Sequence, residues 1–199
     1  MYVCREVTKM TFQKLLRIAL MMTVPLLVMI STASSHPGDE PPDLNSLSDG
    51  DLKALSVSFE RSVCYGTCPA YTVTIHGDGR VEYVGTKNVK ENGTREGRVE
   101  TAKIKILVSE FERAKFFSLS EDYSEGKCRC RVCTDMATAV TELSVKGKTH
   151  RVEHYYGCTC APKALFELEA AIDKSVDTEQ WTGDVSKSGP FGTTCFERR

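Results

Sequence analysis

Hydrophobic and polar residues alternate from residue 55 onward, which is typical of strands buried on one face of a sheet. The first alternating run covers residues 55–63, and two more cover residues 71–75 and 80–85. The last two runs are separated by His-Gly-Asp-Gly at residues 76–79, and an Asp-Gly pair in this position is a strong signal for a tight hairpin. The pattern therefore predicts three consecutive strands joined by short connections.

After residue 100 the hydrophobic spacing changes to the three- and four-residue steps of an amphipathic helix. We predict a helix over residues 101–115, with Thr101 as its N-cap. Residues 138–145 and 149–156 return to alternation around a Lys-Gly-Lys turn, which predicts a second hairpin. A final helix begins with Pro162 near its first position, and its buried face is formed by Leu165, Leu168, Ile172 and Val176.

The element order β-β-β-α-β-β-α predicts an α+β fold, a small antiparallel sheet of about five strands with both helices on one face. This single domain is expected to cover residues 54–182. The polar, proline-rich residues 34–53 are interpreted as a flexible leader, and residues 183–199 as a loose C-terminal tail. Residues 87–98 are also polar and are expected to form a loop with a turn at Asn92-Gly93.

The first 33 residues have the features of a secretory signal peptide. Four basic residues and one acidic residue precede an apolar run at residues 18–30, and small residues follow up to Ala33. This run contains Pro25 and is shorter than the roughly 20 residues that cross a bilayer, so cleavage near Ala33 is favoured over a stable transmembrane anchor. The mature protein is therefore expected to be secreted or periplasmic.

The charge balance argues against one class of partner. The 199-residue chain has 26 basic and 27 acidic residues, and removal of residues 1–33 would leave 22 and 26, a net charge of about −4. No basic excess is present to neutralise phosphates, so no nucleic acid partner is expected. The sequence also contains no P-loop, H-E-x-x-H or G-x-S-x-G motif, which favours a protein that is not an enzyme.

Nine cysteines are the strongest chemical signal in the composition. Cys4 would leave with the signal peptide, and the remaining eight, an even number in an exported chain, favour disulfides. Cys64 and Cys68 enclose three residues with a central glycine, so the chain can fold back and bring the two cysteines within bridging distance. A redox role for this pair is less favoured, because Pro69 leads into a strand whereas reactive dithiols usually begin a helix.

Five further cysteines are expected to gather at one end of the second hairpin. If residues 145 and 148 face each other, Cys133 lies opposite Cys160, and a slightly different turn would place Cys158 there instead. Cys195 on the tail could join them as a sixth member. The five cysteines of this cluster are Cys128, Cys130, Cys133, Cys158 and Cys160.

Two chemistries suit this cluster. Disulfides would tie residues 121–134 to the segment before the last helix, and each cysteine of a C-x-C pair should bridge outside its own motif because an internal bridge is strained. Alternatively, the thiolates could bind Zn²⁺ or Cu(I), because C-x-C and C-x2-C spacings can wrap one soft ion. Export and the even total favour disulfides without a cofactor. His154 lies near the cysteines and could join a metal site, but a surface histidine is the favoured interpretation.

A specific motif, R-x-x-C-[FY]-G-x-C-P-x-Y-x-V, covers residues 61–73 and is followed by Gly-Asp-Gly at residues 77–79. Residues 177–181 fit a D-T-x-x-W ending. On these residues the chain resembles a family of exported bacterial domains of unknown function, over about residues 55–182. The resemblance implies a cell-envelope setting but no activity, substrate or catalytic residue. Its motif includes the first two cysteines of the domain, whereas the five clustered cysteines look like additions.

Two functions follow as hypotheses. The first is a non-catalytic, disulfide-held binding module of the bacterial envelope that contacts a protein or a cell-surface ligand. Its contact surface is expected on the sheet face away from the helices, where Tyr71, Tyr83 and Tyr155 would lie in some register. The alternative is a zinc- or copper-binding protein that uses the cysteine cluster.

Overall fold

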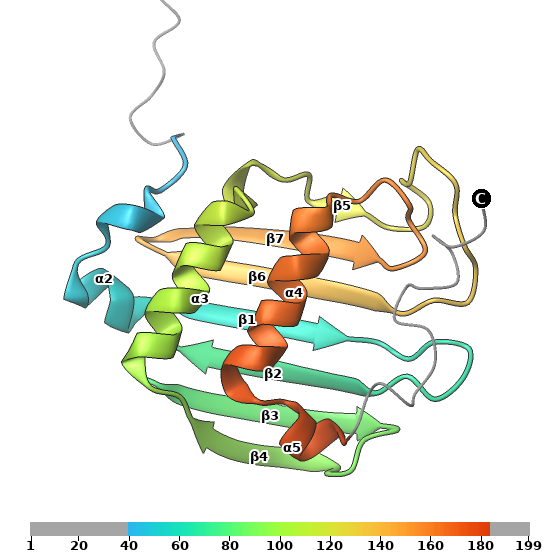
Figure 1. Ribbon diagram of the computed structural model, residues 1–199, viewed down its shortest axis with the longest axis horizontal. Helices are drawn as coiled ribbons and strands as arrows, with labels where there is room; N and C mark the ends of the chain where they lie inside the picture. The colour runs from blue at the N-terminus through green and yellow to red at the C-terminus, as the bar shows by residue number, and fades with distance from the viewer. Residues whose placement is uncertain (1–39, 184–199) are drawn as a thin grey trace, which may run out of the picture. The chain divides into compact units, whose positions relative to one another are not determined.

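The structure is a computed structural model that describes residues 40–183 (Figure 1). The predicted signal peptide, residues 34–39 of the predicted leader and the tail from residue 184 onward lie outside the described residues. The strands are β1 Ser56–Arg61, β2 Ala70–His76, β3 Arg80–Lys87, β4 Gly93–Arg98, β5 Asp122–Tyr123, β6 Thr138–Val145 and β7 Lys148–Tyr155. The helices are η1 Leu44–Ser46, α2 Asp49–Ala54, α3 Thr101–Arg113, η2 Phe116–Ser118, α4 Lys163–Val176 and α5 Glu179–Thr182.

The strands form one sheet in the order β4-β3-β2-β1-β6-β7-β5. All neighbours are antiparallel except β5, which pairs with β7 in parallel. In the second hairpin Val145 pairs with Lys148, the register expected from the sequence. The α+β class is thus confirmed, but the described sheet has seven strands, so the expected number of about five is wrong.

The larger of the two strands that the sequence did not indicate is β4. Its sequence, Gly-Thr-Arg-Glu-Gly-Arg, has no hydrophobic residue, and five of its six residues are exposed. The strand forms because its backbone pairs with β3 from Gly85↔Gly93 to Arg80↔Arg98 at the edge of the sheet. Residues 93–98, expected to be part of a loop, are therefore a charged edge strand, a composition that discourages pairing with other chains.

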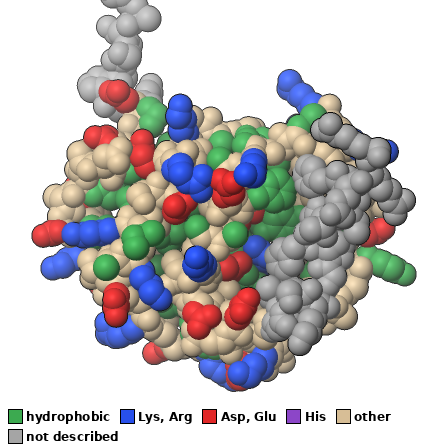
Figure 2. All heavy atoms as spheres, in the orientation of Figure 1, with side chains coloured by type: hydrophobic (Ala, Val, Ile, Leu, Met, Phe, Trp, Pro, Cys, Tyr) green, Lys and Arg blue, Asp and Glu red, His purple; other side chains and the backbone are tan. Residues whose placement is uncertain are grey.

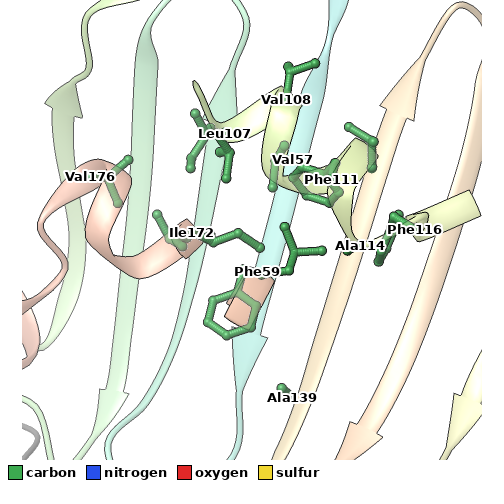
Figure 3. Packing of buried hydrophobic residues seen from close by; sticks show 14 of the residues in the cluster. Val57, Phe59, Leu107, Val108, Phe111, Ala114, Phe116, Ala139, Ile172 and Val176 are labelled. Atoms are coloured by element: carbon green, nitrogen blue, oxygen red, sulfur yellow. The ribbon is translucent and has the colours of Figure 1, made fainter. Parts of the chain in front are cut away.

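Helices α3 and α4 lie side by side across one face of the sheet (Figure 1). Each presents a hydrophobic stripe at helical spacing, and the two stripes meet the side chains of β1 in the core (Figure 3). The N-cap of α3 is Glu100, one residue before the predicted Thr101, and Pro162 is the N-cap of α4. The residues that form the centre of this contact are Val57, Phe59, Leu107, Phe111 and Ile172.

The segment before β1 is folded, which corrects the expectation of a flexible leader for residues 44–53. Ser48 and Asp51 form a capping box at the start of α2, in which each side chain bonds the backbone N–H of the other residue. Leu44 and Leu52 are buried in the common core. The apolar residues of this polar segment therefore anchor it to the sheet.

Within the described part of the chain, no helix covers the second face of the sheet, and this face is polar. Its side chains on the central strands are mostly Ser, Thr and Glu, such as Ser58, Thr74 and Glu142, consistent with an antiparallel sheet that meets water on one side. On the helical face, basic and acidic side chains are interspersed (Figure 2). Within residues 40–183 no helix has the length and apolar character needed to span a membrane.

The packing of Gly77 against α2 gives a test of how α2 is docked on the sheet. A methyl group at residue 77 would lie 1.6 Å from the carbonyl oxygen of Leu52, so the backbone has to move. We expect Gly77→Ala to lower the free energy of unfolding by about 1–3 kcal/mol, the usual cost of overpacking. Gly126→Ala is the matched control, because no atom lies within 4 Å of its added Cβ. Urea unfolding followed by tryptophan fluorescence would measure both, and equal midpoints would contradict the docking of α2.

Candidate functional site

The cysteines of the described residues lie in loops that meet at one end of the sheet, where β1 and β7 end and β2 and β6 begin (Figure 1). We call this region, residues 62–69, 124–137 and 156–161, the stapled end. Cys64 and Cys68 are bridged within the first loop, with their Cα atoms 5.5 Å apart. The backbone N–H of Tyr65 donates to the carbonyl of Asp135, which joins the first loop to the second.

Two more bridges join the second loop to the third. Cys128 is paired with Cys158 and Cys130 with Cys160, with Cα–Cα distances of 5.5 and 5.7 Å. Each C-x-C cysteine thus pairs outside its own motif, and both bridges span 30 residues. We call these two disulfides the double bridge.

The pairing partners differ from the expected register, in which Cys133 lies opposite Cys160 or Cys158. The β6–β7 ladder ends at Thr138↔Tyr155, and the backbone beyond it turns so that the N–H of Cys133 donates to Gly157. An isolated β-bridge then pairs Val132 with Cys158. The expected register assumed that the regular hairpin continues beyond Thr138 and Tyr155. In the structure Cys133 instead lies opposite Gly157, three residues from the expected Cys160.

Cys133 is disulfide-bonded as well, so it does not offer a free thiol. The candidate sixth member of the cluster, Cys195, lies outside the described residues.

The two disulfides of the double bridge are in contact. The Sγ atom of Cys160 lies 3.9 Å from Sγ of Cys128 and 3.8 Å from Sγ of Cys158. Cys158 is fully buried, whereas Cys130 and Cys160 are exposed. The three sulfurs of Cys128, Cys158 and Cys160 line a surface cavity of about 540 Å³ together with Tyr123, Lys127 and Arg129. The outer bridge, Cys130–Cys160, is therefore exposed, whereas the inner bridge, Cys128–Cys158, joins a half-buried cysteine to a fully buried one.

A second candidate site lies between the sheet and α4, around the carboxylate of Asp173. One oxygen accepts hydrogen bonds from the hydroxyls of Tyr71 on β2, at 2.6 Å, and Thr178, at 2.9 Å. The other oxygen pairs with the guanidinium of Arg61 on β1, at 3.0 Å. We call these four residues the Asp173 cluster. With both oxygens occupied by protein donors, this carboxylate is suited to holding elements together and not to accepting a proton from a substrate.

The electrostatics of the Asp173 cluster fit this structural role. Burial raises the pKa of Tyr71 well above its ordinary value, so the hydroxyl stays protonated and donates. Burial also opposes the charge of Arg61, but the neighbouring oxygens of Tyr156 and Asp173 outweigh this effect, and its pKa lies above the ordinary value. The guanidinium also lies 5.1 Å from the ring centroid of Phe59 and 5.3 Å from that of Tyr156, which are cation–π distances.

His154 forms a second buried polar contact with α4. Its Nδ1 atom lies 2.9 Å from a carboxylate oxygen of Glu169, and both side chains are at most 1% exposed. Its ring packs edge-on against Tyr156 and Phe166, with centroids 4.9 and 4.3 Å away. The expected surface histidine is therefore a core residue.

The tyrosines expected on the open sheet face are buried, so the predicted contact surface is wrong. Tyr71 and Tyr83 point toward the helices, where Tyr83 stacks on Trp181 with ring centroids 5.0 Å apart. Tyr155 lies on the other face but is covered by the second loop, because the N–H of Met136 donates to its hydroxyl. The most exposed aromatic side chain among the described residues is Tyr65, which is 87% exposed in the Cys64–Cys68 loop.

Fold and site together define a small α+β domain whose loops are joined by disulfides at one end of an antiparallel sheet. The model of the family described as "Domain of unknown function (DUF6438)" matches residues 55–176, and the chain belongs to this family. No curated protein matches the chain. The description of the family names no activity.

The residues that carried the family resemblance have structural roles. Arg61, the first residue of the motif, and Tyr71, near its end, both bind Asp173, and the cysteines between them close the intervening loop. From the D-T-x-x-W ending, Thr178 completes the Asp173 cluster and Trp181 packs on Tyr83. Sequence reasoning missed Asp173, although an acidic residue next to the hydrophobic stripe of a helix was an available signal.

Removal of Arg61 tests the Asp173 cluster. Because Arg61→Ala removes the charged partner of a carboxylate that is only partly exposed, we expect a loss of about 1.5–3 kcal/mol in the free energy of unfolding, the usual value of a hydrogen bond to a charged group. The matched control is Arg113→Ala, since Arg113 pairs with Glu167 on α4 but is half exposed, and we expect little change there. Urea unfolding would measure both variants. Similar losses would show that the Arg61–Asp173 pair contributes no more to stability than the exposed Arg113–Glu167 pair.

Proposed function

We propose that this protein is an exported, non-catalytic binding module of the bacterial cell envelope whose ligand-contacting surface is the stapled end. The observation that carries the proposal is the double bridge. Two disulfides that join the same two loops support export to an oxidising compartment, because cytosolic thiols are usually kept reduced. The Asp173 cluster and the His154–Glu169 pair are used within the fold, so neither supports a catalytic role.

The Cys64–Cys68 loop is the best candidate for the contact itself. Tyr65 at its tip is 87% exposed, and Val63 beside it is 43% exposed. Tyrosine supplies a large amphipathic contact area and is enriched in the residues that dominate binding energy at protein interfaces. The short disulfide-closed loop holds the ring in place before binding, which lowers the entropic cost of forming a complex. These features favour a protein ligand.

Metal binding is the second candidate, supported by the position of the sulfurs. The Sγ atoms of Cys128, Cys158 and Cys160 all lie within 4.8 Å of one another. Four thiolates around Zn²⁺, each about 2.3 Å from the ion, would lie about 3.8 Å apart, which resembles the separations of Cys160 from the other two. In reduced form, these three cysteines and Cys130 could therefore hold zinc or Cu(I). Cys133 is not part of this three-sulfur group.

The state of the cysteines in the exported protein separates the two candidates. We expect the full chain, made with its own leader in a bacterial host and purified without chelators, to have a mature N-terminus near Ser34 and no free thiol. Intact mass spectrometry before and after alkylation, combined with elemental analysis, would measure this. One equivalent of zinc or copper per chain, with at least four reactive thiols after its removal, would instead support metal binding and overturn the disulfide-held module.

Replacement of Tyr65 tests the contact surface. We expect the immobilised mature protein to retain a component of a bacterial envelope extract saturably, and Tyr65→Ala to reduce this retention at least tenfold. Ile106→Ala is the control, because Ile106 is also exposed, at 62%, but lies on α3. Equal retention by both variants, or no saturable retention by the parent, would contradict the proposed surface.

A further inference from the structure

The double bridge has a feature that stability alone does not require: its two disulfides share a point of contact at Cys160. This cysteine is exposed, lines a cavity, and lies 3.9 and 3.8 Å from the two sulfurs of the inner bridge. Thiol–disulfide exchange requires a thiolate to approach a disulfide sulfur. Once its own bridge opens, Cys160 would already lie beside both possible targets.

We propose that the double bridge is a thiol–disulfide relay that oxidises dithiols and passes the reducing equivalents inward. The outer bridge, Cys130–Cys160, accepts electrons from a dithiol at the cavity, and Cys160 transfers them to the inner bridge, Cys128–Cys158. The relay adds a redox activity to the binding function proposed above, so it replaces the non-catalytic part of that proposal and does not depend on the binding surface.

The first half of the relay consumes one dithiol. A substrate thiolate in the cavity attacks Sγ of Cys160, the S–S bond to Cys130 breaks, and Cys130 leaves as a thiolate that takes up a proton. The second thiolate of the substrate then attacks its own sulfur in the mixed disulfide and releases Cys160 as a thiolate. The dithiol has lost two electrons and two protons and becomes a disulfide, while the outer bridge has gained two electrons.

The second half of the relay is internal and changes no overall oxidation state. The Cys160 thiolate attacks Sγ of Cys128 across 3.9 Å, the inner bridge breaks, and Cys158 leaves and is protonated. A Cys128–Cys160 disulfide replaces the inner bridge. Attack on Cys158 is less favourable, because it would form a strained bridge within Cys158-Thr159-Cys160. After one dithiol, the two thiols are therefore on Cys130 and Cys158.

The surroundings of the cavity fit the entry of a thiolate. Lys127 and Arg129 line it beside the sulfurs, and positive charge stabilises thiolates as nucleophiles and as leaving groups. The cavity, at about 540 Å³, is large enough for a small dithiol or the tip of a peptide loop. Cys158 is fully buried and Cys128 is half-buried, so the exposed Cys160 is the most accessible of the three sulfurs that line the cavity and is the expected point of entry.

The location of the thiols after a single turnover tests the relay. We would add one equivalent of dithiothreitol to the oxidised mature protein, trap thiols with N-ethylmaleimide after acid quenching, and digest with an Asp-specific protease. Fragmentation spectra of the peptides would place each label. We expect labels on Cys130 and on an inner cysteine, chiefly Cys158. Labels confined to Cys130 and Cys160, or first appearing on Cys64 and Cys68, would overturn the relay.

Two paired variants give an independent rate measurement. With the outer bridge removed in Cys130→Ala/Cys160→Ala, we expect reduction of the inner bridge by dithiothreitol to slow at least tenfold. The control, Cys64→Ala/Cys68→Ala, also lacks one bridge but retains the relay, so its label pattern should match the parent. If the first variant does not fold, the label positions in the parent protein still decide whether the relay operates.

The two proposals fail on different results. Labels that show no transfer from Cys160 to the inner bridge would overturn the relay and leave the binding proposal unaffected, whereas bound metal with free thiols would overturn the disulfide-held binding module itself.

Discussion

The ion pair between Asp173 and Arg61 is the interaction on which the arrangement of helix and sheet depends. Burial of the hydrophobic stripe of α4 drives the helix onto the sheet, but apolar contact is not directional and would tolerate other placements. A buried charge without its partner is costly, so only a placement that brings Asp173 to Arg61 and Tyr71 is stable. The same two donors flank the Cys64–Cys68 loop, so the position of α4 and the geometry of the stapled end are set together.

The parts of the fold that follow from hydrophobic periodicity could be predicted from the sequence. The strands β1, β2, β3, β6 and β7 and the helices α3 and α4 all bury one face, and burial produces the alternation or the helical stripe. By contrast, β4 has no side chain in the core and is held by backbone pairing alone, so no pattern of residues identifies it. The short helix α2 did carry a signal, since Ser48 and Asp51 have capping-box spacing. The surrounding prolines and acidic residues are, however, typical of a flexible segment, and they favoured the wrong prediction.

The sequence was enough to predict which cysteines belong to the candidate site, but not which of them pair with one another. Spacing in the sequence places the cysteines near one another, but their partners depend on where the β6–β7 ladder ends, and this is decided by tertiary contacts such as that of Gly157 with Cys133. The tyrosines illustrate the same limit. Alternation assigns Tyr71 and Tyr83 to one face together, but it does not say which face the helices cover. The position of α4 decides which face is covered, and the contacts of Asp173 set that position.

The double bridge separates what disulfides contribute to stability from what else they can do. In the entropic model, a disulfide that closes a loop of about 30 residues lowers the entropy of the unfolded chain and so stabilises the fold by roughly 3–4 kcal/mol. A second bridge between the same two segments closes only the short ring left between them, so it removes much less further entropy. Stability therefore accounts for one bridge far better than for two. The second bridge places the exposed Cys160 in contact with both sulfurs of the less exposed Cys128–Cys158 disulfide, and this arrangement is suited to exchange.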